Sequence, residues 1–294
     1  MKKNLLNISQ EKLMDYALKF YKISMGKKCD IYHPVLFTEK VLWYSFFYNN
    51  PKCSYIVDKV TFKQYINDIL GDGYTIPMFG FWKTIEEFEK AWFSSALPNE
   101  FCLKANLQSD GRNIIIIHDK SSSNFEEIRK EVKEWLKPEN TLMNSFARYF
   151  YLSEPKILAE KYLSNYKNQL YDYKLFCFDG KPYCMYVATE HFMKDDYPIT
   201  FYDLDWNKLD VQYGHHQNAD VPKPVHYEEM KELAKILSKG FPFLRVDFFD
   251  TKEKLYLAEL TFNPGGGFVP YCPESFNRKL GDLFILPNSF NDKI

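Results

Sequence analysis

The chain has 294 residues, of which 46% are hydrophobic and 26% charged, which is enough for one to three compact units. Its 38 basic and 39 acidic residues leave a net charge of −1, which argues against a nucleic-acid-binding stripe or a polybasic membrane patch. The sequence contains no apolar run of about 18 residues, and no signal-peptide core follows its first lysines. We therefore expect a cytoplasmic protein with no membrane span and no nucleic-acid partner.

The first part of the chain is expected to be helical. Apolar residues recur at helical spacing over 9–25, where Ser9 serves as the N-cap. The same spacing predicts further helices over 38–48 and 59–70. Residues 1–75 are therefore predicted to form a helical N-terminal region.

The middle of the chain mixes helices and strands. Residues 84–93 and 125–136 read as helices, and residues 101–106, 113–120 and 156–163 read as strands. The first two strands flank a polar turn. We expect these elements to form a second region, residues 76–162.

The last part of the chain, residues 163–294, is expected to form a third region. Two hairpins are predicted over 173–188 and 243–262, with a helix over 227–239 between them. Antiparallel hairpins without regular βαβ alternation indicate an α+β fold rather than a Rossmann fold.

Arg245, Asp247 and Glu259 carry the strongest chemical signal. Arg245 and Asp247 are two residues apart on one strand, so both side chains point to the same face, and the hairpin turn can bring Glu259 across from them. Such charges within apolar strands need compensation. A divalent cation suits the carboxylates, and a phosphate suits the arginine. The alternative from pattern alone is an Arg-Asp-Glu ion pair on the outer face of a hairpin.

Several other residues have two interpretations each. The loop 263–267 (NPGGG) either lets backbone approach a ligand closely or is a flexible surface loop. Lys104 and Lys174 lie in apolar strands, where each side chain either pairs with phosphate oxygens or faces solvent. Glu160 either holds an adenine amino group or faces solvent.

Taken together, these segments resemble the TupA-like branch of the ATP-grasp superfamily, from about residue 30 to residue 286. The resemblance rests on characteristic stretches that occur in this order: TFKQYINDILGDGYTIPMFGFW, LPNEFCLKAN, PKILAEKYL, YDYKLFCFDGKPY, FYDLDW, FPFLRVDFFD and LAELTFNPGGGF. The last two stretches together are quite specific. The resemblance implies two α+β lobes whose antiparallel sheets clasp ATP, preceded by the helical region.

The resemblance also implies roles for individual residues, with ATP and Mg²⁺ as cofactors. In the smaller lobe it implies that the nucleotide is bound by Lys104, by Ser109 and Gly111 of a covering loop, and by the adenine segment Glu160, Lys161, Tyr162 and Leu163. In the larger lobe it implies that Lys174 contacts the phosphates and that Arg245 acts on the phosphate or acyl phosphate. Asp247 and Glu259 would hold Mg²⁺, with Asn263 as a third ligand or its neighbour.

The sequence departs from the family pattern at three places. The covering loop, residues 104–111, has leucine where the family has histidine after Lys-x-Asn, and only one glycine. Thr261 stands where ATP-grasp enzymes usually have asparagine two residues after the glutamate. Glu190-His191 replaces a common Asp-Arg pair, which implies an altered second substrate or reduced activity.

The implied function is a Mg-ATP-dependent carboxylate–amine ligase. Its carboxylate and amine substrates would be a uronic acid and an amino acid or amine, and the amide would decorate a bacterial cell-surface polysaccharide such as a capsule. One alternative is a glycosyltransferase, for which Asp203-Leu204-Asp205 has the form of an Asp-x-Asp metal motif. A second alternative is a degenerate ATP-grasp protein that binds a nucleotide or glycan without catalysis.

Overall fold

The computed structural model describes residues 9–107, 113–138, 146–163, 170–189, 197–214 and 219–287. Contacts divide the chain into two compact units. Unit 1 is built from Pro51–Asn165, and unit 2 from Ser9–Asn50 together with Tyr166–Ile294. This grouping differs from the continuous division 1–75, 76–162 and 163–294, because the first two helices pack with elements near the other end of the chain. No helix within the described ranges is long and apolar enough to cross a membrane.

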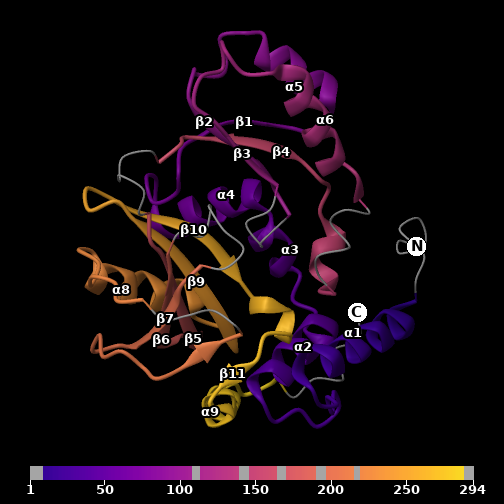
Figure 1. The fold of residues 1–294 in the computed structure, drawn as a ribbon, viewed down its shortest axis with the longest axis vertical. Helices are drawn as coiled ribbons and strands as arrows, with labels where there is room; N and C mark the ends of the chain where they lie inside the picture. Colours follow the sequence, from indigo (N-terminus) through magenta and orange to yellow (C-terminus); the bar gives the residue numbers. More distant parts are fainter. Residues whose placement is uncertain are drawn as a thin grey trace. The chain divides into compact units, whose positions relative to one another are not determined.

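Unit 1 contains a four-stranded antiparallel sheet and helices on both sides of it (Figure 1). In chain order its elements are α3 (Lys52–Val57), α4 (Lys59–Leu70), β1 (Met78–Trp82), α5 (Ile85–Trp92), β2 (Phe101–Ala105), β3 (Ile114–Ile117), α6 (Phe125–Trp135), the 3-10 helix η2 (Arg148–Leu152) and β4 (Ile157–Glu160). The strand order is β1-β4-β2-β3.

The two faces of the unit 1 sheet differ because side chains alternate along each strand. One face carries Leu103 and Ala159, which are cross-strand partners, and packs under the apolar sides of α5 and α6. The other face carries Lys104, with its partner Leu158, and Cys102, with its partner Glu160. The first face supplies the hydrophobic core, and the charged residues Lys104 and Glu160 lie on the second face.

Unit 2 contains a five-stranded antiparallel sheet and a two-stranded one. Its elements are α1 (Gln10–Met25), α2 (Phe37–Phe47), β5 (Asp172–Phe178), β6 (Lys181–Ala188), β7 (Ile199–Asp203), β8 (Gln212–Tyr213), α8 (Tyr227–Ser238), β9 (Phe243–Asp250), β10 (Leu255–Thr261), the 3-10 helix η3 (Pro264–Gly267), β11 (Tyr271–Cys272) and α9 (Glu274–Leu283). The strand orders are β10-β9-β5-β6-β7 and β11-β8.

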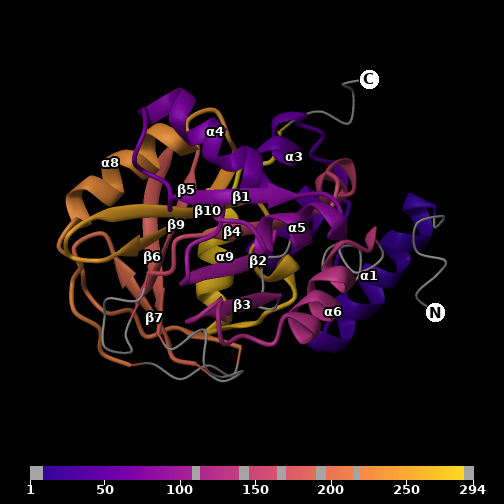
Figure 2. The same cartoon turned by 90° about the horizontal axis from the view of Figure 1, so that it is seen from above.

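Helices cover the large sheet of unit 2 differently on its two sides. Helix α8 packs against β5, β6 and β9, beside which it is seen in Figure 2. On the other face, Phe37 of α2 contacts the rings of Phe176 and Phe243 at centroid distances of 5.8 and 5.0 Å. Alternation places Arg245 and Asp247 on the same face as Phe243, further along β9. That face is therefore aromatic at one end and charged at the other.

Local sequence signals explain most helix boundaries. The hydroxyl of Ser9 accepts a hydrogen bond from the backbone N–H of Lys12, as the predicted N-cap requires. In α5, Thr84 and Glu87 form a reciprocal capping box. The α-helices predicted over 9–25, 38–48, 59–70, 84–93, 125–136 and 227–239 are all confirmed within one residue at either end.

Other expectations need correction. The strand predicted over 156–163 is only four residues long, and β4 ends at Glu160. The strand predicted over 113–120 is β3, also four residues long. The segment NPGGG forms the tight turn η3, within which Gly265 and Gly266 have left-handed rather than helical φ angles. The short elements α3, β1, β7, β8, η2 and β11 were not predicted, because such segments lack a long periodic pattern. Helix α9 was also missed, although its buried residues Phe276, Asn277, Leu280 and Gly281 recur at helical spacing.

Candidate functional site

A row of polar side chains crosses the large sheet of unit 2. Tyr186 on β6, Lys174 on β5, Asp247 on β9 and Glu259 on β10 are successive cross-strand partners. Directly opposed residues share a face of the sheet. A register shift in β10 between Leu257 and Glu259 sets the Glu259 carboxylate opposite Asp247. The predicted proximity of the two carboxylates is therefore confirmed.

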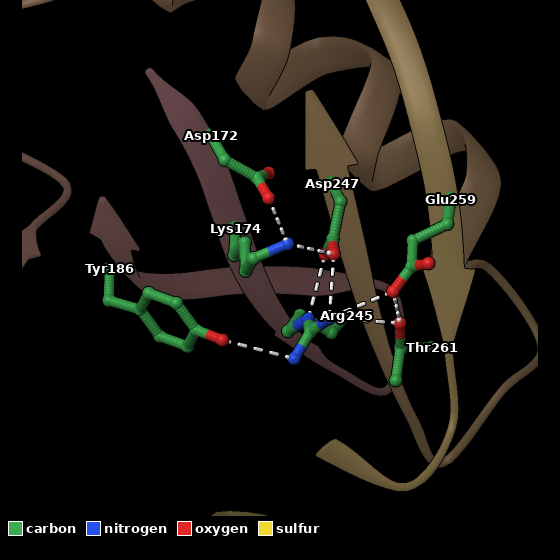
Figure 3. A network of polar contacts seen from close by, with 7 residues as sticks. All are labelled: Asp172, Lys174, Tyr186, Arg245, Asp247, Glu259 and Thr261. Atoms are coloured by element: carbon green, nitrogen blue, oxygen red, sulfur yellow. Dashed lines mark hydrogen bonds and ion pairs between the residues drawn. The ribbon is translucent and has the colours of Figure 1, made fainter. Parts of the chain in front are cut away.

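Arg245 lies on β9 next to this row and contacts three of its four members (Figure 3). Its Nε and Nη2 donate to the two carboxylate oxygens of Asp247 at 2.7 and 2.6 Å, in a bidentate pair. Nη2 also donates to Glu259 Oε1 and Thr261 Oγ1, both at 3.1 Å. Nη1 donates to the hydroxyl of Tyr186 at 3.2 Å. These contacts fix the plane of the guanidinium group on the sheet face.

Lys174 joins a third carboxylate to the network. Its Nζ lies 2.6 Å from Asp172 Oδ2 and 2.7 Å from Asp247 Oδ2. Burial alone would lower the pKa of Lys174, but Asp172 and Asp247 outweigh it and raise that pKa above its ordinary value. The same balance, with Asp247 as the main partner, raises the pKa of Arg245. Both side chains are therefore cationic across the physiological range.

With every group ionised, the network carries one net negative charge; burial raises the pKa of Asp247, against the opposing effect of Arg245 and Lys174. Three carboxylates, Asp172, Asp247 and Glu259, face two cations, Lys174 and Arg245, so the sum is −3 + 2 = −1. A residual negative charge in a buried site favours a further cation, and carboxylate oxygens are the donors that Mg²⁺ prefers. The donor chemistry of this face therefore fits Mg²⁺.

The two carboxylates differ in access. Asp247 is fully buried, and both of its oxygens are held by Arg245 and Lys174. The Glu259 side chain is 20% exposed. Across the described ranges, no group of three or more His, Cys, Asp or Glu side chains is arranged to hold a metal. Glu259 is thus the carboxylate that an incoming Mg²⁺ would meet first.

A second charged cluster lies in unit 1. Glu160, at the end of β4, is ion-paired through Oε1 to Lys63 Nζ at 2.6 Å and through Oε2 to Lys104 Nζ at 2.7 Å. Burial would raise the pKa of Glu160, but Lys104 and Lys63 outweigh it and lower that pKa to about 2. The sum over the three groups is +2 − 1 = +1. Of the two interpretations of Lys104, the structure supports a side chain that is mostly buried and paired, and its partner in this structure is a carboxylate.

The sheet face around this cluster is otherwise apolar. Lys104 is the cross-strand partner of Ile114 and Leu158, and Cys102 is the partner of Ile116. Both isoleucines are half-buried. Burial raises the pKa of the Cys102 thiol to about 11, so the group stays neutral. An apolar strip with a positive cluster suits a flat heterocycle that bears an anionic group.

The remaining predicted nucleotide residues follow β4 or lie outside the described residues. The backbone N–H of Lys161 donates to the carbonyl of Pro77 at 2.8 Å. The Tyr162 ring contacts His118 edge-on, at a centroid distance of 5.3 Å, and Leu163 is half-buried. The covering-loop residues Ser109 and Gly111 and the pair Glu190-His191 fall outside the described ranges.

The glycine-rich segment after β10 packs tightly against its surroundings. Gly265, Gly266 and Gly267 all have left-handed φ angles, of 56, 62 and 80°. A Cβ on Gly265 would lie 2.5 Å from the Tyr213 hydroxyl, and one on Gly267 would lie 2.4 Å from the carbonyl of Thr38. Asn263 precedes this turn, and its carbonyl accepts a hydrogen bond from Gly266 N–H. Close packing therefore requires glycine here, so the segment is not a loose surface loop.

The Asp-x-Asp sequence at 203–205 has a structural role. Asp203 Oδ1 accepts hydrogen bonds from the backbone N–H groups of Asp205 and Asn207, at 2.9 and 2.8 Å. Its Oδ2 accepts from the Asn207 side chain at 2.9 Å. These bonds close the turn after β7, and they occupy the oxygens that a nucleotide-sugar metal would need.

Several partners within the two clusters were not predicted. Asp172 and Tyr186 complete the unit 2 network, and Lys63 completes the unit 1 cluster. The Asp172–Lys174 spacing of two on an apolar strand repeats the Arg245–Asp247 signal and could have identified Asp172. Lys63 gives no such signal, because it lies on an amphipathic helix 97 positions before Glu160 in the sequence.

The model of the family described as TupA-like ATPgrasp matches residues 39–285. No curated protein matches the chain. Solved structures with a similar fold include D-alanine-D-alanine ligase from Helicobacter pylori, with 16% identity, 79% of this chain and 59% of that chain covered, and a TM-score of 0.44.

Two further solved structures are similar at the same level. D-alanine–D-alanine ligase from Bacillus anthracis has 16% identity, with 78% of this chain and 66% of that chain covered and a TM-score of 0.43. The biotin carboxylase domain of Hydrogenobacter thermophilus 2-oxoglutarate carboxylase, solved with MgADP, has 19% identity, with 71% and 40% covered and a TM-score of 0.41. The chain thus spans 59% of the length of the Helicobacter ligase and 40% of that of the carboxylase domain.

Proposed function

The chain belongs to the TupA-like ATP-grasp family, and from this premise we propose that it is a Mg-ATP-dependent ligase that joins a carboxylate to an amine. The observation that carries the proposal is the buried network of Arg245, Lys174, Asp247 and Glu259 on one sheet face of unit 2. Its cations suit phosphate oxygens, and its carboxylates suit a divalent metal.

The reaction has two steps. An oxygen of the substrate carboxylate attacks the γ-phosphorus of ATP, the bond to the β-phosphate oxygen breaks, and an acyl phosphate and ADP form. The amine nitrogen then attacks the acyl carbon, phosphate leaves with the bonding electrons, and the amine proton passes to the medium. Neither step needs an enzyme nucleophile.

The residues of unit 2 would stabilise the charge that develops on the transferred group. Arg245 presents a guanidinium fixed by Asp247, and Lys174 presents an ammonium fixed by Asp172, so neither has to reorganise during the reaction. Asp247 and Glu259, with Asn263 nearby in sequence, would hold Mg²⁺, which neutralises charge on the phosphate oxygens. Preorganised cations of this kind act most strongly on the transition state.

The residues of unit 1 would bind the nucleotide itself. Lys104 supplies a positive charge for phosphate oxygens, and the apolar face around Leu158 and Ile114 supplies a surface for the base. Glu160 and the following Lys161, Tyr162 and Leu163 supply polar groups for the edge of the adenine ring. We assign Ser109 and Gly111 to the loop that covers the phosphates.

For the substrates, we propose a uronic acid and an amino acid or other amine, so that the product is an amide on a cell-surface polysaccharide made from cytoplasmic precursors. This choice follows the family resemblance. The test is ADP release in a coupled assay with Mg-ATP, across a panel of uronates and amines offered singly and in pairs. Release should rise only with a matching pair, and Glu259→Gln should abolish the rise.

A matched control variant tests whether the effect of Glu259→Gln is specific to the site. Asp220→Asn removes a carboxylate that is paired to Lys208 at the surface, and it should leave ADP release unchanged. Flat ADP output across the whole panel, from protein that binds Mg-ATP, would count against a ligase.

That outcome would support a nucleotide-binding protein without catalysis. One observation favours this second candidate, since both Asp247 oxygens are already held by protein cations. A glycosyltransferase is disfavoured by the turn that occupies the oxygens of Asp203.

A further inference from the structure

The guanidinium group of Arg245 reaches Glu259 through a shared hydrogen bond. Its Nη2 carries two hydrogens but faces three acceptors, namely Asp247 Oδ2 at 2.6 Å and Glu259 Oε1 and Thr261 Oγ1, both at 3.1 Å. The short bond to Asp247 takes one hydrogen, so the other is divided between Glu259 and Thr261. Arg245 is therefore bound tightly to Asp247 and more weakly to Glu259.

The Thr261 hydroxyl makes the shorter of these two contacts with Glu259 Oε1. Its Oγ1 donates to Oε1 at 2.8 Å, and the same atom accepts from Arg245 Nη2. Thr261 is the cross-strand partner of Arg245 and lies two residues after Glu259 on β10, so the three side chains share one face of the hairpin. The Thr261 side chain is buried, and the branch at its Cβ restricts rotation. The hydroxyl is thus fixed between a cation and a carboxylate.

We propose that Thr261 is a positioning residue for the metal-binding carboxylate Glu259: its hydroxyl holds Oε1 beside Arg245 and so presents the second carboxylate oxygen to Mg²⁺. This inference rests on the proposed function. Figure 3 shows the second oxygen of Glu259 turned away from the guanidinium group. Thr261 Oγ1 and Glu259 Oε1 each lie 3.1 Å from a positively charged nitrogen, where a dication would be repelled. Thr261 therefore acts through Glu259 and does not bind the metal itself.

Loss of the hydroxyl would weaken metal binding more than it weakens phosphoryl transfer. The terminal torsion of a glutamate is broad, so a carboxylate that loses the shorter of these contacts is held less firmly. Ordering that carboxylate when the metal arrives then costs conformational entropy. A hydrogen bond to a charged group is worth about tenfold in affinity. The affinity for the metal therefore reports on Thr261, whereas Arg245 keeps its bidentate pair with Asp247.

The experiment measures the dissociation constant of Mn²⁺ in the presence of saturating ADP. Electron paramagnetic resonance reports the unbound ion, and a protein-free solution with the same ADP gives the baseline. Mn²⁺ is suitable because it prefers the same oxygen ligands as Mg²⁺. Thr261→Val keeps the size of the side chain but removes the hydroxyl, so it should weaken Mn²⁺ binding by about tenfold. Thr261→Ser keeps the hydroxyl and should bind Mn²⁺ nearly as tightly as the wild type.

Thr251→Val is the matched control on the same hairpin. The Thr251 hydroxyl donates to the carbonyl of Lys254 at 2.8 Å and accepts from the backbone N–H of Lys254 at 3.1 Å. Thr251 and Thr261 are buried to the same extent, at 7% and 8% exposed, but Lys254 belongs to the turn between β9 and β10. Thr251→Val should therefore lower the free energy of unfolding and leave the dissociation constant of Mn²⁺ unchanged.

A second variant keeps the test informative if Thr261→Val folds poorly. Thr261→Cys has a side chain of similar size whose thiol is only a weak hydrogen-bond donor. It should weaken Mn²⁺ binding in the same direction as Thr261→Val, and Thr261→Ser remains the variant that restores it.

The outcomes separate the role of Thr261 from the function on which it rests. Wild-type affinity for Mn²⁺ in both Thr261→Val and Thr261→Cys overturns the inference and leaves the proposed function intact. Equal weakening in Thr261→Ser and Thr261→Val, or in Thr251→Val and Thr261→Val, also overturns it, because the effect would then not depend on the hydroxyl at Glu259. Failure of the wild type to bind Mn²⁺ with ADP contradicts the proposed function itself.

Discussion

Replacement of Lys174 by methionine tests how strongly the buried network of unit 2 depends on each charge. The Lys174 ammonium lies 2.6 Å from Asp172 and 2.7 Å from Asp247, and the side chain is 9% exposed. At an effective dielectric constant of about 20, each attraction amounts to about 6 kcal/mol, and the cost of burying the ammonium cancels much of this. Removing one partner of such a buried group typically costs about 3–5 kcal/mol, because the remaining carboxylates are left uncompensated.

The matched control is Lys208→Met. Lys208 pairs with Asp220 at 2.8 Å, nearly the same distance, but its side chain is 41% exposed, so its loss should cost only about 0–1 kcal/mol. The loss of unfolding free energy in each variant is measured by urea unfolding, followed through hydrogen exchange of the β5 and β9 amides. Mg²⁺ should restore part of the stability of Lys174→Met, since that network carries −3 + 1 = −2. Equal losses for the two variants would refute the reasoning from burial.

Three other predictions concern the same unit. Gly265→Ala should destabilise the protein by more than Gly26→Ala, which should cost about 1–2 kcal/mol. Both residues have positive φ, but only at Gly265 would the new Cβ meet a hydroxyl, at 2.5 Å. Thermal unfolding of the two variants measures the difference. Arg245→Lys should lower the rate of ADP release by at least about tenfold with little change in nucleotide affinity, because an ammonium cannot make the bidentate pair. At pH 8, iodoacetamide should modify the exposed Cys272 well before Cys29, because burial raises the pKa of Cys29 to about 12; peptide mass mapping gives the order, and equal rates would contradict it.

The part of the unit 2 site formed by β9 and β10 could be predicted from the sequence because its geometry is local. Arg245 and Asp247 are two residues apart on a strand, and a single hairpin turn returns the chain to Glu259. Alternation along the strand then places the charges on one face. The register shift before Glu259, which fixes the final alignment, has no signature in the sequence LYLAELTF.

The unit 1 cluster could be predicted only in part. Lys104 and Glu160 stood out as charges within apolar strands, but their mutual pairing depends on β2 and β4 being neighbours. Lys63 lies on a helix whose polar residues all resemble solvent-facing ones. Its burial depends on how α4 packs in unit 1, which is a tertiary feature.

The packing of α1 and α2 within unit 2 also could not be predicted from local sequence patterns. Phe37 packs on Phe176 and Phe243, and the Thr38 hydroxyl accepts a hydrogen bond from Asn277 at 3.1 Å. These contacts join residues more than 130 positions apart. Helical periodicity identifies the helix and its apolar character but not the sheet that it will cover.

The most direct test of the proposed site is a thermal-shift titration with Mg-ATP, Mg-ADP and Mg-UDP-sugars on the wild type, Glu259→Gln and Asp220→Asn. We expect Mg-ATP at about a hundred times its Kd to stabilise the wild type and Asp220→Asn by about 2.7 kcal/mol, a shift of several degrees, and to stabilise Glu259→Gln much less. Stabilisation by a UDP-sugar alone, or equal stabilisation of Glu259→Gln by Mg-ATP, would contradict an ATP site built on these carboxylates.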